Sequence, residues 1–133
     1  MQNRTYLVGG AVNNLIEGFA LVLYSPSRFY EGNFQNNVKH GQGFEFLPNG
    51  VYVGNFVNNK PEGRGSFYWN NNEAYEGEFL AGMKHGSGRW TSSSETYVGE
   101  WKTNKPDGLG VIVTRESRYE GEIQCGLKHG HGK

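Results

Sequence analysis

Residues 75–79 read Tyr-Glu-Gly-Glu-Phe, and residues 84–88 read Lys-His-Gly-Ser-Gly. Alternate side chains of an extended strand share a face, so the tyrosine, glycine and phenylalanine of the first string lie on one side and its two glutamates on the other. Gly82 stands between the two strings, and glycine tolerates the positive φ of a tight hairpin turn. This stretch therefore predicts one antiparallel β-hairpin.

The same pattern recurs along the chain at intervals of 22 or 23 residues. Tyr-x-Gly begins five segments, residues 30–51, 52–74, 75–96, 97–118 and 119–133, and the last segment ends before its second strand is complete. Residues 1–29 contain a degenerate first copy, so we count about six repeats in a single domain. The residues that define the repeat are Tyr30, Gly32, Gly41, Gly43, Tyr52, Gly54, Gly63, Gly65, Tyr75, Gly77, Gly86, Gly88, Tyr97, Gly99, Gly108, Gly110, Tyr119 and Gly121.

A single β-hairpin is at best marginally stable in water. Stacked hairpins can share a continuous stripe of aromatic rings, and rings that lie over glycines compensate for the weak packing of glycine in strands. We expect the rings of one hairpin to cover the glycines of the next. The predicted fold is all-β: an elongated, single-layer antiparallel meander of stacked β-hairpin repeats.

The strings at residues 75–79 and 84–88 resemble the MORN repeat (membrane occupation and recognition nexus), and the resemblance covers nearly the whole chain. It implies a twisted single-layer sheet with a groove along one face. It also implies scaffold roles in cytoskeletal, ciliary and membrane-associated assemblies. Some members join the repeats to a separate enzyme domain, and no such domain occurs within these 133 residues.

The charges of the chain balance, with 13 Lys and Arg residues against 13 Asp and Glu residues. A zero net charge argues against nucleic-acid binding, which needs a basic surface, and weakens the case for anionic lipid. Cys125 is the one cysteine, so no internal disulfide can form and a reducing compartment is favoured. We expect a cytoplasmic protein associated with the cytoskeleton or a cilium.

No catalytic, cofactor-binding or metal-binding residue is expected, so the chain is not predicted to be an enzyme. His40, His85 and His129 recur in every second repeat, about 20 Å apart, which is too far to share one ion. His129 and His131 share a strand face and could hold an ion only weakly. The Gly-x-Gly strings lack the lysine, hydroxyl residue and following helix of a phosphate-binding loop.

The repeats alternate between two types, which indicates duplication of a two-hairpin unit of about 45 residues. The eleventh position of the repeat alternates between an acid and a histidine. Its members are Glu17, His40, Glu62, His85, Asp107 and His129. A solvated edge of weak ion pairs is the favoured interpretation, and a pH-sensitive stripe that a partner recognises is the alternative.

Glu45 departs from the pattern, because it stands where other copies have Phe67, Trp90 or Ile112. Either a bulge shifts this strand by one residue, or a carboxylate faces the aromatic stripe. We favour the bulge, because an unpaired buried charge is costly.

The favoured function is a protein-interaction scaffold that binds a partner helix or extended segment along its groove, with aromatic anchors. The alternatives are a phospholipid-headgroup module and the targeting domain of a longer enzyme. The incomplete last repeat leaves an open strand edge, so we expect end-to-end association, a homo-oligomer or a longer native chain. The candidate partner-binding residues are Tyr68, Trp69, Trp90, Trp101, His40 and His85.

Overall fold

The computed structural model describes residues 6–12, 15–124 and 127–132, and it describes side chains from residue 16 to residue 124. These residues form one sheet of twelve strands without a helix. The strands are β1 (Tyr6–Val12), β2 (Leu15–Ser25), β3 (Arg28–Gln35), β4 (Val38–Leu47), β5 (Gly50–Val57), β6 (Lys60–Trp69), β7 (Ala74–Leu80), β8 (Met83–Thr91), β9 (Glu95–Lys102), β10 (Lys105–Thr114), β11 (Arg118–Gln124) and β12 (Leu127–Gly132).

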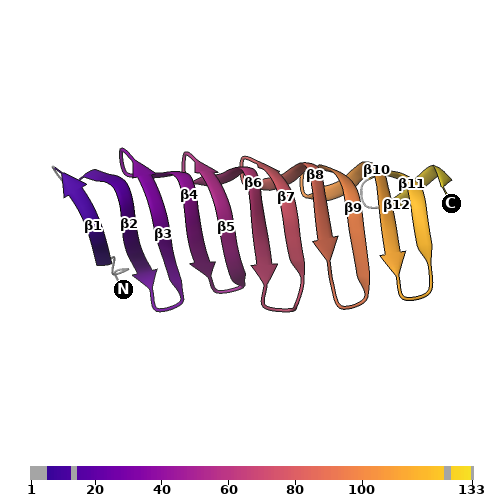
Figure 1. The fold of residues 1–133 in the computed structure, drawn as a ribbon, viewed down its shortest axis with the longest axis horizontal. Coiled ribbons are helices and arrows are strands. Elements are labelled where there is room, and N and C mark those ends of the chain that lie inside the picture. Colours follow the sequence, from indigo (N-terminus) through magenta and orange to yellow (C-terminus); the bar gives the residue numbers. More distant parts are fainter. Residues whose placement is uncertain (1–5, 13–14, 125–126, 133) are drawn as a thin grey trace.

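The order of the strands in the sheet is their order in the sequence, and every neighbouring pair that we describe is antiparallel. The strands follow one another along the long axis of the molecule, with β1 and β12 at opposite ends (Figure 1). The predicted elongated meander of stacked hairpins is therefore confirmed.

One face of the sheet, here called the inner face, carries the repeat tyrosines. Tyr30, Tyr52 and Tyr75 are at most 1% exposed. Tyr30 meets Phe34 of its own strand and Phe56 of the next hairpin edge-on, with ring centres 5.0 and 5.1 Å apart. The same arrangement repeats as far as Trp101. A buried ring contributes about 1.5–3 kcal/mol, and an edge-on pair adds roughly 0.5–1.5 kcal/mol, so this stripe holds the hairpins together.

The tyrosine rings cover glycines of their own hairpin rather than those of the next one. A Cβ atom on Gly43 would collide with the ring of Tyr30, and Gly43 also pairs directly with Gly32 across the two strands. The Tyr30 hydroxyl donates to the Asn33 carbonyl at 2.8 Å, which holds the ring along its own strand pair. For the tyrosines, the expectation that rings cover the glycines of the next hairpin is therefore wrong, because the tyrosines meet the next hairpin ring against ring.

The hairpin turns have two successive residues with positive φ, which is the signature of a type I′ turn. The glycine or asparagine expected at the second turn position is found there in the four copies whose turns the structure describes. Asn14 and Gly126 lie outside the described residues. The four turns are Asn36 and Asn37, Asn58 and Asn59, Ala81 and Gly82, and Thr103 and Asn104.

These turns attach each hairpin to the one before it. The Asn59 side-chain oxygen accepts a hydrogen bond from the Lys39 backbone N–H at 2.8 Å, and the Asn59 N–H donates to the Lys39 carbonyl at 3.1 Å. Asn104 makes the same two bonds with Lys84. The turn asparagines therefore position the strand segments that carry these two lysines.

Two acidic members of the alternating position, Glu17 and Glu62, also bind turns. The Glu17 carboxylate accepts from the Asn36 N–H at 2.9 Å, and the Glu62 carboxylate accepts from the Ala81 N–H at 2.8 Å. The three ion pairs between described side chains include no histidine. At this position, Glu17 and Glu62 therefore each supply a carboxylate that accepts a hydrogen bond from the turn of the next hairpin.

The strand around Glu45 has no bulge, so the interpretation that we favoured is wrong. Glu45 pairs with Tyr30 in the register in which Phe67 pairs with Tyr52. Its carboxylate faces the ring stripe and the residue is only 6% exposed. The charge is tolerated there because the Lys39 ammonium lies 2.6 Å away and forms an ion pair with it.

Candidate functional site

A hollow of about 240 Å³ lies on the inner face over β8, β9 and β10. Its walls include Lys84 and Trp90 of β8, Glu95 and Trp101 of β9, and Ile112 of β10. Trp90 and Ile112 stand on either side of the buried Tyr97 in one cross-strand row. The strand register therefore places an indole and an aliphatic side chain beside a lysine.

All three tryptophans of the chain lie around Lys84. The Lys84 ammonium is 4.9 Å from the ring centre of Trp69 and 5.3 Å from that of Trp101. Trp90 shares the walls of the hollow with Lys84, and its indole N–H donates to Glu73 at 3.2 Å. Contact with the faces of such rings stabilises a cation.

The electrostatic state of Lys84 follows from its half-buried position. Burial lowers the pKa of the Lys84 ammonium, and the carboxylate of Glu73 opposes this effect. No ion pair joins Lys84 to a carboxylate within the described part of the chain. The hollow therefore contains a cation that rings surround and that no anion in direct contact neutralises.

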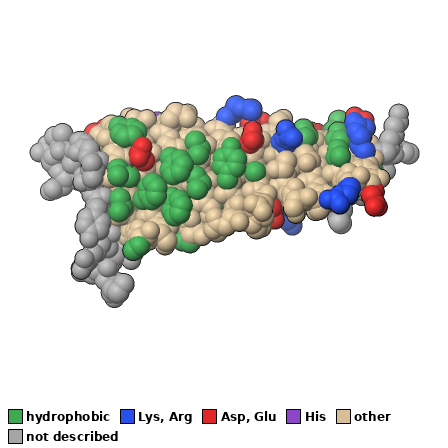
Figure 2. Space-filling view, turned by 60° about the horizontal axis from the view of Figure 1, so that its bottom comes forward, with side chains coloured by type: hydrophobic (Ala, Val, Ile, Leu, Met, Phe, Trp, Pro, Cys, Tyr) green, Lys and Arg blue, Asp and Glu red, His purple; other side chains and the backbone are tan. Residues whose placement is uncertain are grey.

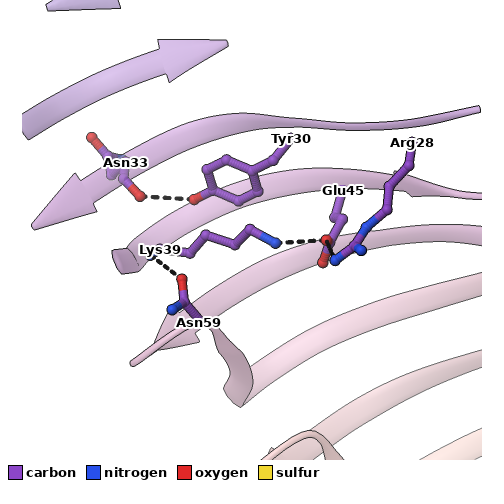
Figure 3. A network of polar contacts seen from close by, with 6 residues as sticks. All are labelled: Arg28, Tyr30, Asn33, Lys39, Glu45 and Asn59. Atoms are coloured by element: carbon purple, nitrogen blue, oxygen red, sulfur yellow. Dashed lines mark hydrogen bonds and ion pairs between the residues drawn. The ribbon is translucent and has the colours of Figure 1, made fainter. Parts of the chain in front are cut away.

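Lys39 occupies the same place 45 residues earlier in the sequence. Its ammonium lies over the rings of Tyr24, Tyr30 and Phe56, which correspond to the three rings that surround the Lys84 ammonium. Here the chain also supplies the anion, because Glu45 lies between Lys39 and Arg28 (Figure 3). The Arg28 guanidinium is 3.4 Å from the Glu45 carboxylate, and the Arg28 side chain is about half exposed.

The opposite, outer face carries an apolar surface over β2 to β6, here called the outer patch. A cross-strand row runs through Leu23, Phe29, Phe46, Val51 and Tyr68, with Leu21, Phe44 and Val53 beside it. The ring of Phe29 stacks on those of Phe46 and Phe44, at 5.3 and 5.9 Å. Hydrophobic side chains gather near the N-terminal end in Figure 2, and charged ones are more frequent towards the other end.

The structure separates the six candidate partner-binding residues. It brings Trp69, Trp90 and Trp101 together around Lys84, although Trp101 is buried within the ring stripe. Tyr68 is 46% exposed and lies in the outer patch, on the face opposite to Trp69. His40 is exposed and His85 is half-buried, and neither lines the hollow.

Lys84 and the outer patch were not among the sequence candidates. An alignment of the two 45-residue units would have indicated Lys84. It pairs Lys84 with Lys39 and shows that Trp90 occupies the position of Glu45. The outer patch depends on the regular pairing of β4 around Glu45, which the predicted bulge would have shifted by one residue. Without that bulge, Phe44 and Phe46 point outward.

Two further findings concern the described residues. Their side chains contain no group of three or more His, Cys, Asp and Glu that could hold a metal ion. The described residues also form no helix that is long and apolar enough to cross a membrane. The side chains of Cys125, His129 and His131 lie outside the described part.

Hairpins that stack in sequence order through a shared ring stripe define a β-hairpin repeat protein. The sequence matches the MORN repeat at residues 30–51, 52–73, 75–96, 97–114 and 119–133, which is more than half of the chain. The chain therefore belongs to the MORN-repeat family, as the resemblance indicated. MORN repeats are generally interaction or membrane-binding modules and are typically not catalytic. A search among curated proteins finds no significant match.

Proposed function

We propose that this protein is a non-catalytic scaffold that binds a segment of another protein along its inner face. The assembly would be cytoskeletal, ciliary or membrane-associated, as the family resemblance implies. The observation that carries the proposal is the hollow on the ring stripe of the inner face, whose walls bring the Lys84 ammonium together with the half-buried side chains of Trp90 and Ile112. Aromatic and cationic groups in a concave site are typical anchors for a partner.

The sheet is suited to bind without rearrangement. The strands that carry the site are paired with neighbours on both sides, and the tyrosine rings are held by hydrogen bonds to backbone carbonyls. A partner helix or extended segment that crosses β8, β9 and β10 would meet side chains that are already in place. A preorganised surface loses little conformational entropy on binding, which favours affinity.

The experiment compares one variant on each face of the sheet. Trp90→Ala removes the indole beside the hollow, and Tyr68→Ala removes a ring of comparable size from the outer patch. Each tagged variant is used for affinity purification from cells, followed by quantitative mass spectrometry, after circular dichroism has shown that it is folded. We expect Trp90→Ala to lose partners that the wild type and Tyr68→Ala retain.

The opposite result would contradict the proposal. If Tyr68→Ala loses the partners and Trp90→Ala retains them, binding occurs through the outer patch and not along the inner face.

A further inference from the structure

The two 45-residue units surround an equivalent lysine in nearly the same way. Asn59 and Asn104 accept hydrogen bonds from the backbone N–H groups of Lys39 and Lys84, at 2.8 and 2.9 Å. Each ammonium lies over three aromatic rings at matching positions. A difference between the two sites therefore comes from the few positions at which the units differ.

The decisive difference is the anion. Glu45 forms an ion pair with Lys39 at 2.6 Å, whereas Trp90 occupies the position equivalent to Glu45 in the second unit. Glu73 is the acid near Lys84, but its two carboxylate oxygens accept hydrogen bonds from the Trp90 indole and the Asn71 amide. Within the described residues, Lys84 thus has the aromatic surroundings of Lys39 without a carboxylate in contact.

We propose that the hollow binds the carboxylate of an aspartate or glutamate of a partner polypeptide, which forms with Lys84 the ion pair that Glu45 forms with Lys39. This inference rests on the proposed function and names the partner chemistry of the same site. The hollow is open to both Lys84 and Trp90, so a carboxylate can reach the ammonium from there while an apolar neighbour packs against the indole and Ile112.

An acidic polypeptide fits this site better than a phosphate group does. Phosphate recognition in proteins typically uses clusters of arginines, whereas the walls of the hollow contain one cation, Lys84. The carboxylate of Glu95 lines the same hollow, and Glu73 lies nearby. Both would repel a dianion more strongly than a monoanion, and Glu95 can accept a hydrogen bond from a donor next to the acid in the partner.

The test uses peptides selected from a phage-displayed random library on the immobilised protein. Because all three tryptophans surround Lys84, tryptophan fluorescence reports peptide binding at this site. Lys84→Met removes the charge and keeps an unbranched side chain, and Lys102→Met is the matched control at an exposed lysine. Peptides whose binding is lost with Trp90→Ala are taken as inner-face ligands.

We expect the inner-face ligands to share an aspartate or glutamate. Changing that residue to asparagine or glutamine lowers their affinity for the wild type by about tenfold or more, because removing one partner of a desolvated charge pair typically costs more than the roughly 1.4 kcal/mol that corresponds to tenfold. The same change has little effect on binding to Lys84→Met, and Lys102→Met behaves as the wild type. The peptide substitution on wild-type protein gives the answer even if Lys84→Met does not fold.

The contrary outcomes separate the two proposals. Inner-face ligands that need neither an acid nor Lys84 overturn the carboxylate assignment and leave the scaffold function standing. If no selected peptide depends on Trp90, the scaffold function itself fails. If vesicles of phosphatidylcholine and phosphatidylinositol 4-phosphate bind in a manner that depends on Lys84, while acidic peptides do not, the ligand is a phosphate and the assignment is wrong.

Discussion

The ammonium of Lys39 lies 2.6 Å from the carboxylate of Glu45, and both side chains are less than one-tenth exposed (Figure 3). This ion pair lies among the aromatic rings of the inner face. Each charge is costly to bury alone, and the close contact between them offsets the cost. The pair is therefore more sensitive to the loss of one partner than to the loss of both.

We expect Lys39→Met to lower the free energy of unfolding by about 3 kcal/mol, because it leaves Glu45 buried with only the exposed Arg28 guanidinium nearby. Glu45→Met should have a similar effect, because it leaves Lys39 buried without its carboxylate. The double variant should lose much less than the two single losses added together. Urea denaturation of the four proteins gives the coupling energy, and strictly additive losses would show that the pair is not coupled.

Gly88→Ala should destabilise the protein by roughly 1–3 kcal/mol, the range for overpacking a tightly packed site. The new methyl group would collide with the ring of Tyr75, which cannot move without breaking its contacts with Phe79 and Trp101. Ser87→Ala, one residue away and exposed, is the matched control and should change stability by less than about 0.5 kcal/mol. Equal thermal shifts in the two variants would mean that the tyrosine does not restrict the glycine.

Thr103→Asn should raise the free energy of unfolding by up to about 1 kcal/mol. Thr103 has φ of 50° at the first turn position, where the equivalent hairpins have Asn36 and Asn58. A β-branched side chain is strained in this conformation, and asparagine tolerates it. The reverse change, Asn58→Thr, should lower stability by a similar amount. Thermal unfolding measures both, and shifts of the same sign would refute the strain.

The stability of the protein should fall as the pH rises from about 10 to about 12. Burial, with a smaller contribution from nearby carboxylates, raises the pKa of Tyr30, Tyr75 and Tyr97 from 10.0 to about 12. Their hydroxyls bind protons more tightly in the folded state, so the stabilisation is complete below pH 10 and is lost as the pH rises through the folded pKa. Circular dichroism and tyrosinate absorbance should therefore change together in this range. Tyrosine ionisation near pH 10 without unfolding would contradict the expectation.

The hairpins could be predicted from local residues because each one depends on neighbours in the sequence. The Tyr-x-Gly string, the turn asparagine and the later Gly-x-Gly string act within a single repeat, as the ring of Tyr52 over Gly65 shows. The opposite orientation of Tyr68 and Trp69 also follows from strand alternation, although both residues are among the candidates for binding one partner. Features of this kind need only the geometry of a strand.

Glu45 shows where local reasoning fails. The rule that an unpaired buried charge is costly is correct, but it cannot tell whether a partner is present. The partner, Lys39, is in the same strand. The pairing of β4 with β3 is irregular between the pairs Gly32–Gly43 and Phe34–Lys39, and this irregularity brings Lys39 closer to Glu45 than a regular strand would. The prediction of a bulge was wrong because the sequence does not show that the Lys39 ammonium lies beside Glu45.

The order of residues determined by itself the repeat, the hairpins, the turns and the family, because these depend on spacing and on the conformations that glycine and asparagine allow. Only the tertiary structure decided which rings meet between hairpins, that Glu45 neutralises Lys39, and that Lys84 lies beside an open hollow without such a carboxylate. The physical reason is that burial and charge pairing depend on side chains that strand pairing and the stacking of hairpins bring into contact. These distances exist only once the hairpins have packed.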